Sequence, residues 1–158
     1  MHPRMCIYIY HDMKESLPAL PCIASSFRRT SRALTQLYEQ ALRPVGIRAT
    51  QFTILQTLSL AGEVSQGQLG EMLAMDSTTL TRTLVIMRRH GWIAERRGED
   101  LRERWLRLAK TGETQLNRAL PSWEKVQSHL RDQLGEHAWK NLMQLTNQVT
   151  TLATNRGD

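Results

Sequence analysis

The sequence predicts a mainly α-helical protein with one small β-hairpin, arranged as a winged helix-turn-helix domain with additional helices at both ends. Two observations support this fold class. A short capped helix and a helix rich in Ser, Thr and Arg occupy residues 65–90. Two short segments dense in arginine then flank a polar turn within residues 92–108. A helix pair followed directly by a hairpin is the order of elements in a winged helix-turn-helix.

The N-terminal third contains two predicted helices. Residues 1–20 lack sustained periodicity, and we expect them to form a flexible tail. A first helix is expected over residues 21–42, where apolar residues recur at helical spacing and a proline stands in the first turn. A second helix is expected to begin at Thr50, a favourable N-cap residue, and to end at Gly62, which fits a C-terminal stop.

The helix-turn-helix is predicted to follow. Ser65 and the glutamine three residues later form a capping-box pattern, so a third helix is expected to run from there to about Leu73. Gly70 is a poor helix former, and we expect its small size to let the next helix approach closely. A turn over residues 74–76 leads to the fourth helix, which is expected over residues 77–90.

A β-hairpin, the wing of the domain, is predicted next. Strands are expected over residues 92–97 and 102–108, around a polar turn at residues 98–101. Apolar residues hold the hairpin against the helices, while its arginines project. The winged helix-turn-helix is therefore expected to extend over about residues 48–110.

The last third of the chain is predicted to be helical again. Thr111 is expected to open a fifth helix with a kink at Pro121, and a glycine separates it from a final helix. The apolar stripes of the terminal helices exceed what a small winged domain buries. We therefore predict that helices at about residues 21–43 and 111–154 form a dimerisation surface, within a single domain of residues 21–158.

Charge and cysteine content limit the function classes. Lys and Arg total 21 against 15 Asp and Glu, a net charge of +6, and eight of the arginines fall between residues 82 and 107. Such a cluster suits an anionic partner, either nucleic acid or a membrane surface. Two cysteines form no disulfide framework, the five histidines are scattered, and no apolar run approaches the roughly 20 residues that span a bilayer. We therefore expect a cytoplasmic protein that inserts in no membrane and holds no metal or cofactor.

The start of the fourth helix has the composition of a DNA recognition helix. A helix that enters the major groove needs short polar residues near its N-terminus and a long donor that reaches a base edge or a phosphate. The first need is met by Ser77, Thr78, Thr79 and Thr81, and the second by Arg82. The alternative is a solvated amphipathic helix, although Ser and Thr are mediocre helix formers. The predicted contact set further includes Ser65, Gln66 and Arg88.

The hairpin carries a second set of candidate contacts. An arginine at a narrow ribbon tip can insert into a minor groove, where A·T-rich sequence focuses negative potential. Arg102 leaves the turn two residues after Asp100, so the carboxylate can orient the guanidinium in a bidentate pair. The alternative is a surface ion pair worth about 0–1 kcal/mol. The other candidate contacts in the hairpin are Arg96, Arg97 and Arg104.

These motifs resemble the multiple antibiotic resistance regulator (MarR) family. Members have a Gly-apolar pair after the recognition helix, an Asp-x-Arg motif in the wing and a Leu-Thr-x-x-Gly segment. The resemblance is strongest over residues 76–93 and 99–112 and extends over about residues 22–154. Ala109 departs from the pattern by replacing a threonine, and Arg97 by replacing a further wing aspartate that many members carry. The matching motifs here are Gly91-Trp92, Asp100-Leu101-Arg102 and the segment from Leu108 to Gly112.

The resemblance implies a homodimer whose N- and C-terminal helices interlock, leaving two winged domains to read a pseudo-palindrome in double-stranded DNA. The recognition helices of such a dimer are expected about 34 Å apart, which is one turn of DNA. The resemblance also implies a repressor that is released by a small anionic or phenolic ligand, or by cysteine oxidation.

Cys22 is the candidate redox or effector site. It lies beside the start of the first predicted helix, where partly unsatisfied N–H groups can lower the pKa of a thiol. The resemblance adds that some hydroperoxide-sensing members use a cysteine near this helix. The alternative is that Cys22 serves as a small apolar residue in the dimer interface.

Two other functions are weighed against a ligand-responsive DNA-binding regulator. An enzyme needs a convergent nucleophile, base and electrophile, or a metal, and the sequence offers no Ser/His/Asp set, His/Cys cluster or phosphate-binding glycine loop. A winged-helix module for protein–protein contacts, without sequence-specific DNA binding, is the remaining alternative. It would need neither the polar start of the fourth helix nor an arginine at the wing tip.

Overall fold

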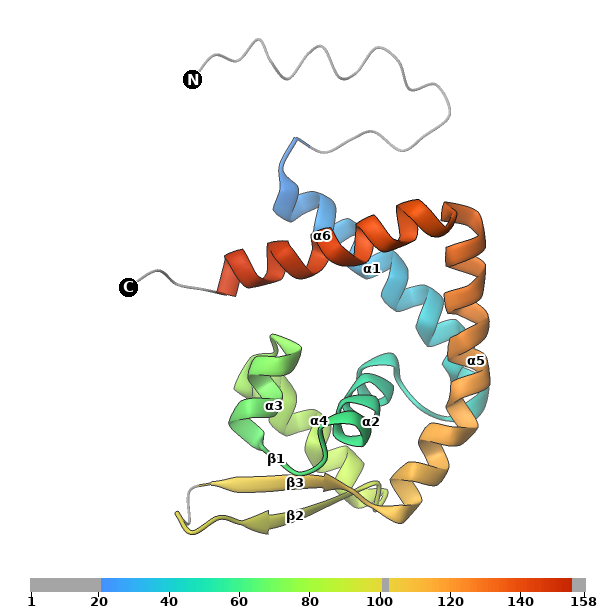
Figure 1. Ribbon diagram of the computed structural model, residues 1–158. Helices are drawn as coiled ribbons and strands as arrows, with labels where there is room; N and C mark the ends of the chain where they lie inside the picture. Colours follow the sequence, from blue (N-terminus) through green and yellow to red (C-terminus); the bar gives the residue numbers. More distant parts are fainter. Residues whose placement is uncertain (1–20, 101–102, 155–158) are drawn as a thin grey trace, which may run out of the picture. The chain divides into compact units, whose positions relative to one another are not determined.

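The computed structural model describes residues 21–100 and 103–154, and it confirms the predicted fold class. Two compact units divide the chain between Leu37 and Tyr38. The first contains most of α1, and the second contains the elements that follow it (Figure 1). The predicted tail of residues 1–20 lies outside the described residues. In chain order the elements are α1 (Ile23–Leu42), η3 (Arg43–Val45), α2 (Ala49–Ala61), β1 (Val64–Ser65), α3 (Gln66–Leu73), α4 (Ser77–Arg89), β2 (Ile93–Arg97), β3 (Arg104–Leu108), α5 (Lys110–Leu134) and α6 (Glu136–Thr154).

The N-terminus of α2 differs from the sequence prediction. The helix begins at Ala49, so Thr50 lies inside it and is not its cap. The carboxylate of Glu39, at the end of α1, accepts a hydrogen bond of 2.9 Å from the Ala49 N–H. The Arg48 N–H donates to the Gln51 Oε1 at 3.0 Å. A carboxylate from the preceding helix therefore binds the first N–H group of α2, and the helix does not begin with a hydroxyl cap at Thr50.

The helix-turn-helix has the caps that the sequence predicts for α3. Ser65 Oγ accepts from the Gln68 N–H at 3.1 Å, and the Gln68 side chain accepts from the Ser65 N–H at 2.9 Å. At the start of α4, Asp76 Oδ1 accepts from the Thr79 N–H at 2.9 Å. The turn between the helices contains Ala74 in the left-handed conformation, with a φ of 48°. Both helices therefore begin at residues fixed by side-chain hydrogen bonds.

The wing has three strands, one more than predicted. The strand order is β1-β3-β2, and both pairs are antiparallel. Leu106 of β3 stands opposite Val64 of β1 on one side and opposite Glu95 of β2 on the other. Strand β1 has only two residues, which is too short to show an alternating pattern in the sequence. It ties the start of α3 directly to the wing.

The core of the second unit lies between α2, α4, α5 and the sheet. From α4, Leu80, Leu84 and Met87 are fully buried at helical spacing, as the sequence predicts. The other side chains with almost no exposure are Leu42, Ile54, Leu55, Leu58, Leu69 and Leu106. The buried stripe of α4 fixes which of its faces remains open to solvent.

Glycine is required for close packing at Gly112 rather than at Gly70. A Cβ at Gly70 would lie 3.4 Å from the Met75 carbonyl oxygen and 3.5 Å from Leu80 Cδ2, which are ordinary contact distances. A small residue at Gly70 therefore lies against Leu80 of α4, as expected, although alanine would fit there as well. A Cβ at Gly112 would lie 2.0 Å from the Trp92 carbonyl oxygen, so the first turn of α5 can approach this backbone only with glycine.

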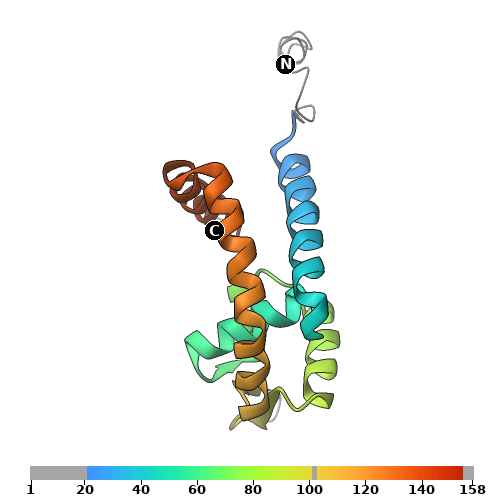
Figure 2. The same cartoon turned by 90° about the vertical axis from the view of Figure 1, so that its right-hand side faces the viewer.

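Helix α5 leads away from the end of the hairpin, and α6 follows it after Gly135 (Figure 2). α5 is one helix of 25 residues that includes Pro121. None of the residues of α6 is buried. Within the described residues, no helix is long and apolar enough to cross a membrane.

Candidate nucleic-acid interface

The polar start of α4 is open to solvent. The five residues that the sequence singled out here are all exposed: Ser77, Thr78, Thr79, Thr81 and Arg82. Hydrogen bonds from the hydroxyl and the N–H of Thr79 hold the pKa of Asp76 below its usual range, so this cap is a carboxylate at neutral pH. The helix therefore presents short polar side chains on a turn whose backbone is fixed.

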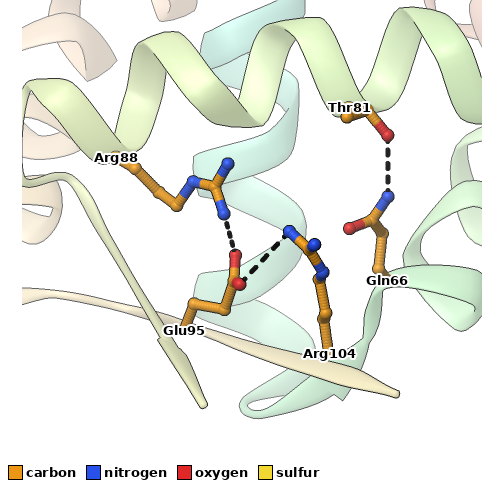
Figure 3. Close-up of polar contacts among 5 residues, drawn as sticks. All are labelled: Gln66, Thr81, Arg88, Glu95 and Arg104. Carbon is orange, nitrogen blue, oxygen red and sulfur yellow. Dashed lines mark hydrogen bonds and ion pairs between the residues drawn. The ribbon is translucent and has the colours of Figure 1, made fainter. Parts of the chain in front are cut away.

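A hydrogen bond joins α3 to this face of α4. Gln66 Nε2 donates to Thr81 Oγ1 at 2.9 Å (Figure 3). Two predicted contact residues from different helices thus lie side by side. The amide oxygen of Gln66 remains available to a further donor, and the amide fixes the orientation of the Thr81 hydroxyl.

The wing divides its arginines between two faces. Side chains alternate along β2, so Glu95 and Arg97 point to one face while Arg96 points to the other. On the face toward α4, the Glu95 carboxylate pairs with Arg88 of α4 and, at 3.5 Å, with Arg104 of β3 (Figure 3). This face carries Arg97 as well, because Arg97 stands opposite Arg104 in the ladder.

The opposite face of the wing holds a different ion pair. Arg96 donates to both carboxylate oxygens of Glu63, at 2.9 Å and 2.6 Å, and its guanidinium lies 5.3 Å from the ring centroid of Trp105. The bond to Arg96 lowers the pKa of Glu63, and the same bond raises the pKa of Arg96. The predicted contact Arg96 is therefore bound to the protein itself, on the face away from α4.

The tip of the wing is described only in part. Arg102 lies outside the described residues, so its pairing with Asp100 stays a prediction. The Asp100 carbonyl accepts from the Glu103 N–H at 2.9 Å, and the Gly98 N–H donates to the Glu103 carbonyl at 3.0 Å. Asp100 is exposed beside this turn.

An open groove brings several predicted contact residues together. Its volume is about 1110 Å³, and its lining comes mainly from α3, the turn after it and the start of α4, with Arg104 from β3. Among the lining residues are Ser65, Gln66, Ser77 and Arg104. The lining also includes the carboxylates of Glu71, Asp76 and Glu103, so the groove joins predicted contact residues without being a cationic surface.

Cys22 belongs to the first unit. It is exposed, and hydrogen bonds from the backbone and side chain of Ser25 and from the backbone of Ala24 lower its pKa, with a smaller contribution from the charge of Arg28. The sequence expectation of a more acidic thiol at the start of α1 agrees with this direction. Among the described residues, no group of three His, Cys, Asp or Glu side chains is placed to bind a metal.

Sequence reasoning missed the acidic partners of the arginines. Glu95 and Glu63 each bind arginines of the wing, and neither was singled out. The position of Glu95 could have been predicted from the sequence. Side chains alternate along a strand, which places Glu95 on the same face as Arg97 and on the face opposite to Arg96. For Glu63 no such signal existed, since its partner is 33 residues away in the chain.

Comparison with known proteins gives the following similarities. The sequence model of the MarR family matches residues 47–103. The M. tuberculosis transcriptional regulator MosR, in a crystal structure of its complex with DNA, is 32% identical in sequence to this chain. The two structures superpose with a TM-score of 0.76 over 84% of this chain and 96% of MosR.

Two further relatives are more distant. A mutant E. coli MarR complexed with operator DNA is 21% identical, with a TM-score of 0.72 over 80% of this chain and 92% of that one, and shows the similarity of fold. The uncharacterised HTH-type transcriptional regulator YwoH of Bacillus subtilis is 29% identical over 85 residues. That match spans 54% of this chain and 62% of YwoH, a little under two thirds of the relative.

Proposed function

The chain belongs to the MarR family of transcriptional regulators, and from this premise we propose that it binds double-stranded DNA sequence-specifically as a homodimer. Its relatives and its fold are those of transcriptional regulators and not of enzymes. One observation carries the proposal. The exposed Ser/Thr/Arg start of α4 lies on the same side of the domain as the arginines of the wing face that bears Glu95. A major-groove helix flanked by cationic groups for the phosphates is the arrangement that winged domains use.

The proposed contacts fall into two classes. Base-edge contacts are assigned to residues at the start of α4 and to their neighbour on α3, namely Ser77, Thr78, Thr79, Thr81, Arg82 and Gln66. Phosphate and minor-groove contacts are assigned to Ser65, Arg88, Arg97, Arg102 and Arg104, with Asp100 orienting Arg102. We leave Arg96 out of this set because its Nε and Nη2 both donate to Glu63, on the face of the wing away from α4.

The homodimer is proposed from the apolar side chains that α6 leaves exposed, among them Leu145 and Leu152. A monomer gains nothing from such a stripe, whereas a second copy would bury it. Two copies related by a two-fold axis would also place two α4 helices on successive half-sites of a pseudo-palindrome.

The regulatory part of the proposal is a repressor released by a small aromatic or anionic ligand, or by oxidation at Cys22. The exposed thiol and its lowered pKa support the second route. We expect Cys22→Ser to abolish peroxide-induced release from DNA. Release that persists in this variant would leave Cys22 with a packing role in the dimer interface.

The test of the proposed function begins with selection of bound duplexes from a randomised library by the purified protein. Recovery of a pseudo-palindrome supports the proposal. Arg102→Ala is then expected to weaken binding to the recovered duplex by about 1–3 kcal/mol and to leave the dimer mass unchanged. Recovery of no preferred sequence would favour the alternative, a winged-helix module for protein contacts. Because the proposed target is DNA, we also propose a cytoplasmic location.

A further inference from the structure

We propose that Glu95 determines how well this protein distinguishes its operator from other DNA, by holding one arginine of α4 and one arginine of the wing. The inference rests on the proposed function and adds a residue to it. Glu95 would not contact DNA itself. It is a positioning residue that acts through Arg88 and Arg104.

Glu95 of β2 connects the wing to α4. Its Oε2 accepts from Arg88 Nη1, and its Oε1 accepts from Arg104 Nη1 at 3.5 Å (Figure 3). The Glu95 side chain is 21% exposed, against 32% for Arg88 and 51% for Arg104. The Glu95 side chain is therefore less exposed than the side chain of either arginine that it binds.

The charge balance of this cluster bears on non-specific binding. Two guanidiniums that share one carboxylate carry a net charge of +1 instead of +2. Non-specific affinity for DNA depends on the number of phosphates that cationic groups neutralise. The Glu95 carboxylate thus lowers the general attraction for DNA at the junction of α4 and the wing.

The same cluster fixes where the remaining donors lie. A guanidinium held by a carboxylate offers its free N–H groups in one orientation, whereas an unpaired arginine can follow a phosphate anywhere within reach of its long side chain. Phosphate contacts made in one orientation set the register of the protein on the duplex. Glu95 would therefore favour the operator, where this register also aligns the start of α4 with the bases.

A matched control exists within the same sheet. Glu63 also binds an arginine of β2, but on the face of the wing away from α4. Glu95→Gln and Glu63→Gln each remove one negative charge; the first disrupts the ion pairs with Arg88 and Arg104, and the second disrupts the ion pair with Arg96. Only the first releases arginines that face the proposed DNA surface.

The experiment measures binding to two labelled duplexes of equal length, one recovered by the wild-type protein from a randomised library and one with that sequence scrambled. Affinities are determined between about 50 and 200 mM salt. We expect Glu95→Gln to bind the scrambled duplex about threefold more tightly at the lowest salt, with a slope of log K against log salt steeper by about one. The ratio of specific to non-specific affinity should fall, while Glu63→Gln should keep the wild-type slope.

A double variant separates this role from a structural one. In Glu95→Gln combined with Arg88→Gln the released charge is absent, so the slope should return toward the wild-type value. An unchanged slope in Glu95→Gln, or parallel loss of affinity for both duplexes, would overturn the inference and leave the proposed function standing. If the wild-type protein shows no preference between the two duplexes, the proposed function itself is refuted, and the inference with it.

Discussion

The helices α4 and α6 are both amphipathic, and they differ in the face that they leave exposed. α4 buries Leu80, Leu84 and Met87 and presents hydroxyl and guanidinium groups to solvent. α6 buries none of its residues, and its large exposed side chains include Leu142, Met143, Leu145 and Leu152. The first pattern suits a hydrated and anionic partner, and the second suits an apolar protein surface.

Threonine content alone does not separate the two helices. The hydroxyls of Thr146, Thr150 and Thr154 in α6 donate to carbonyl oxygens of their own helix. In α4 the Thr83 hydroxyl does the same toward the Thr79 carbonyl, but the Thr81 hydroxyl accepts a hydrogen bond from Gln66 of α3. What distinguishes a recognition helix is therefore the neighbour that orients its hydroxyls, together with the exposed arginines beside them.

The largest expected effect comes from placing a charge on the exposed apolar side of α6. Leu145→Glu should dissociate the proposed dimer and lower affinity for the selected duplex by about two to four orders of magnitude, because each half-site is then bound separately. Sedimentation and DNA titration measure the two effects. Asn147→Glu places the same charge at an exposed polar position on the opposite side of α6 and serves as the control. A dimeric Leu145→Glu protein would remove α6 from the interface.

The same Leu→Ala truncation should act differently on the two helices. Leu84→Ala empties a buried position and should lower the free energy of unfolding by about 2–5 kcal/mol. Leu145→Ala removes a side chain that is 56% exposed, so it should leave the unfolding of dilute protein nearly unchanged and reduce only its concentration dependence. Denaturant titrations at two protein concentrations make the comparison. Equal losses at the two positions would mean that α6 packs against its own chain.

The exposed face of α4 is tested by its longest donor. Arg82→Ala should weaken binding by about 1–3 kcal/mol on the selected duplex and by less on a scrambled one, because a lost base contact matters only where the base is correct. Competition binding with both duplexes measures the difference. A uniform loss on both would assign Arg82 to a phosphate.

The smallest effect concerns the cap of α4 and its dependence on pH. The folded state lowers the pKa of Asp76, so its stabilising contribution is present above the unfolded pKa and is lost as pH falls through the lower folded value. The stability difference between the wild type and Asp76→Asn should therefore be constant near neutral pH and shrink below about pH 4. Thermal melts of both proteins across this range test it, and a difference that grows on acidification would contradict it.

Much of the fold could be predicted because its signals are local. The capping box at Ser65, the buried spacing of Leu80 and Leu84, and the hairpin after Gly91 each depend on residues within a few positions of one another. The start of α2 could not be predicted from Thr50, because its first N–H group is bound by a carboxylate on another helix.

The candidate site was predictable in its residue types but not in its pairings. The neighbours Arg96 and Arg97 were both predicted to contact DNA, whereas strand alternation sends their side chains to opposite faces of the wing. Glu63 and Glu95 were missed because a carboxylate shows its role only when the fold brings it to an arginine. These ion pairs depend on the tertiary structure, and they decide which arginines remain available to DNA.

The close contact at Gly112 joins the C-terminal end of α4 to the first turn of α5, so a tilt of α4 would turn about this end. The Trp92 carbonyl, just beyond the end of α4, accepts from the Ala109 N–H at 3.0 Å and abuts Gly112 in the first turn of α5. The Thr111 hydroxyl donates to the Gly91 carbonyl at the same junction. α4 has 13 residues, a length of roughly 20 Å, so tilting it by about 10° about this end would displace its tip by roughly 3 Å. A displacement of that size exceeds the tolerance of a hydrogen bond.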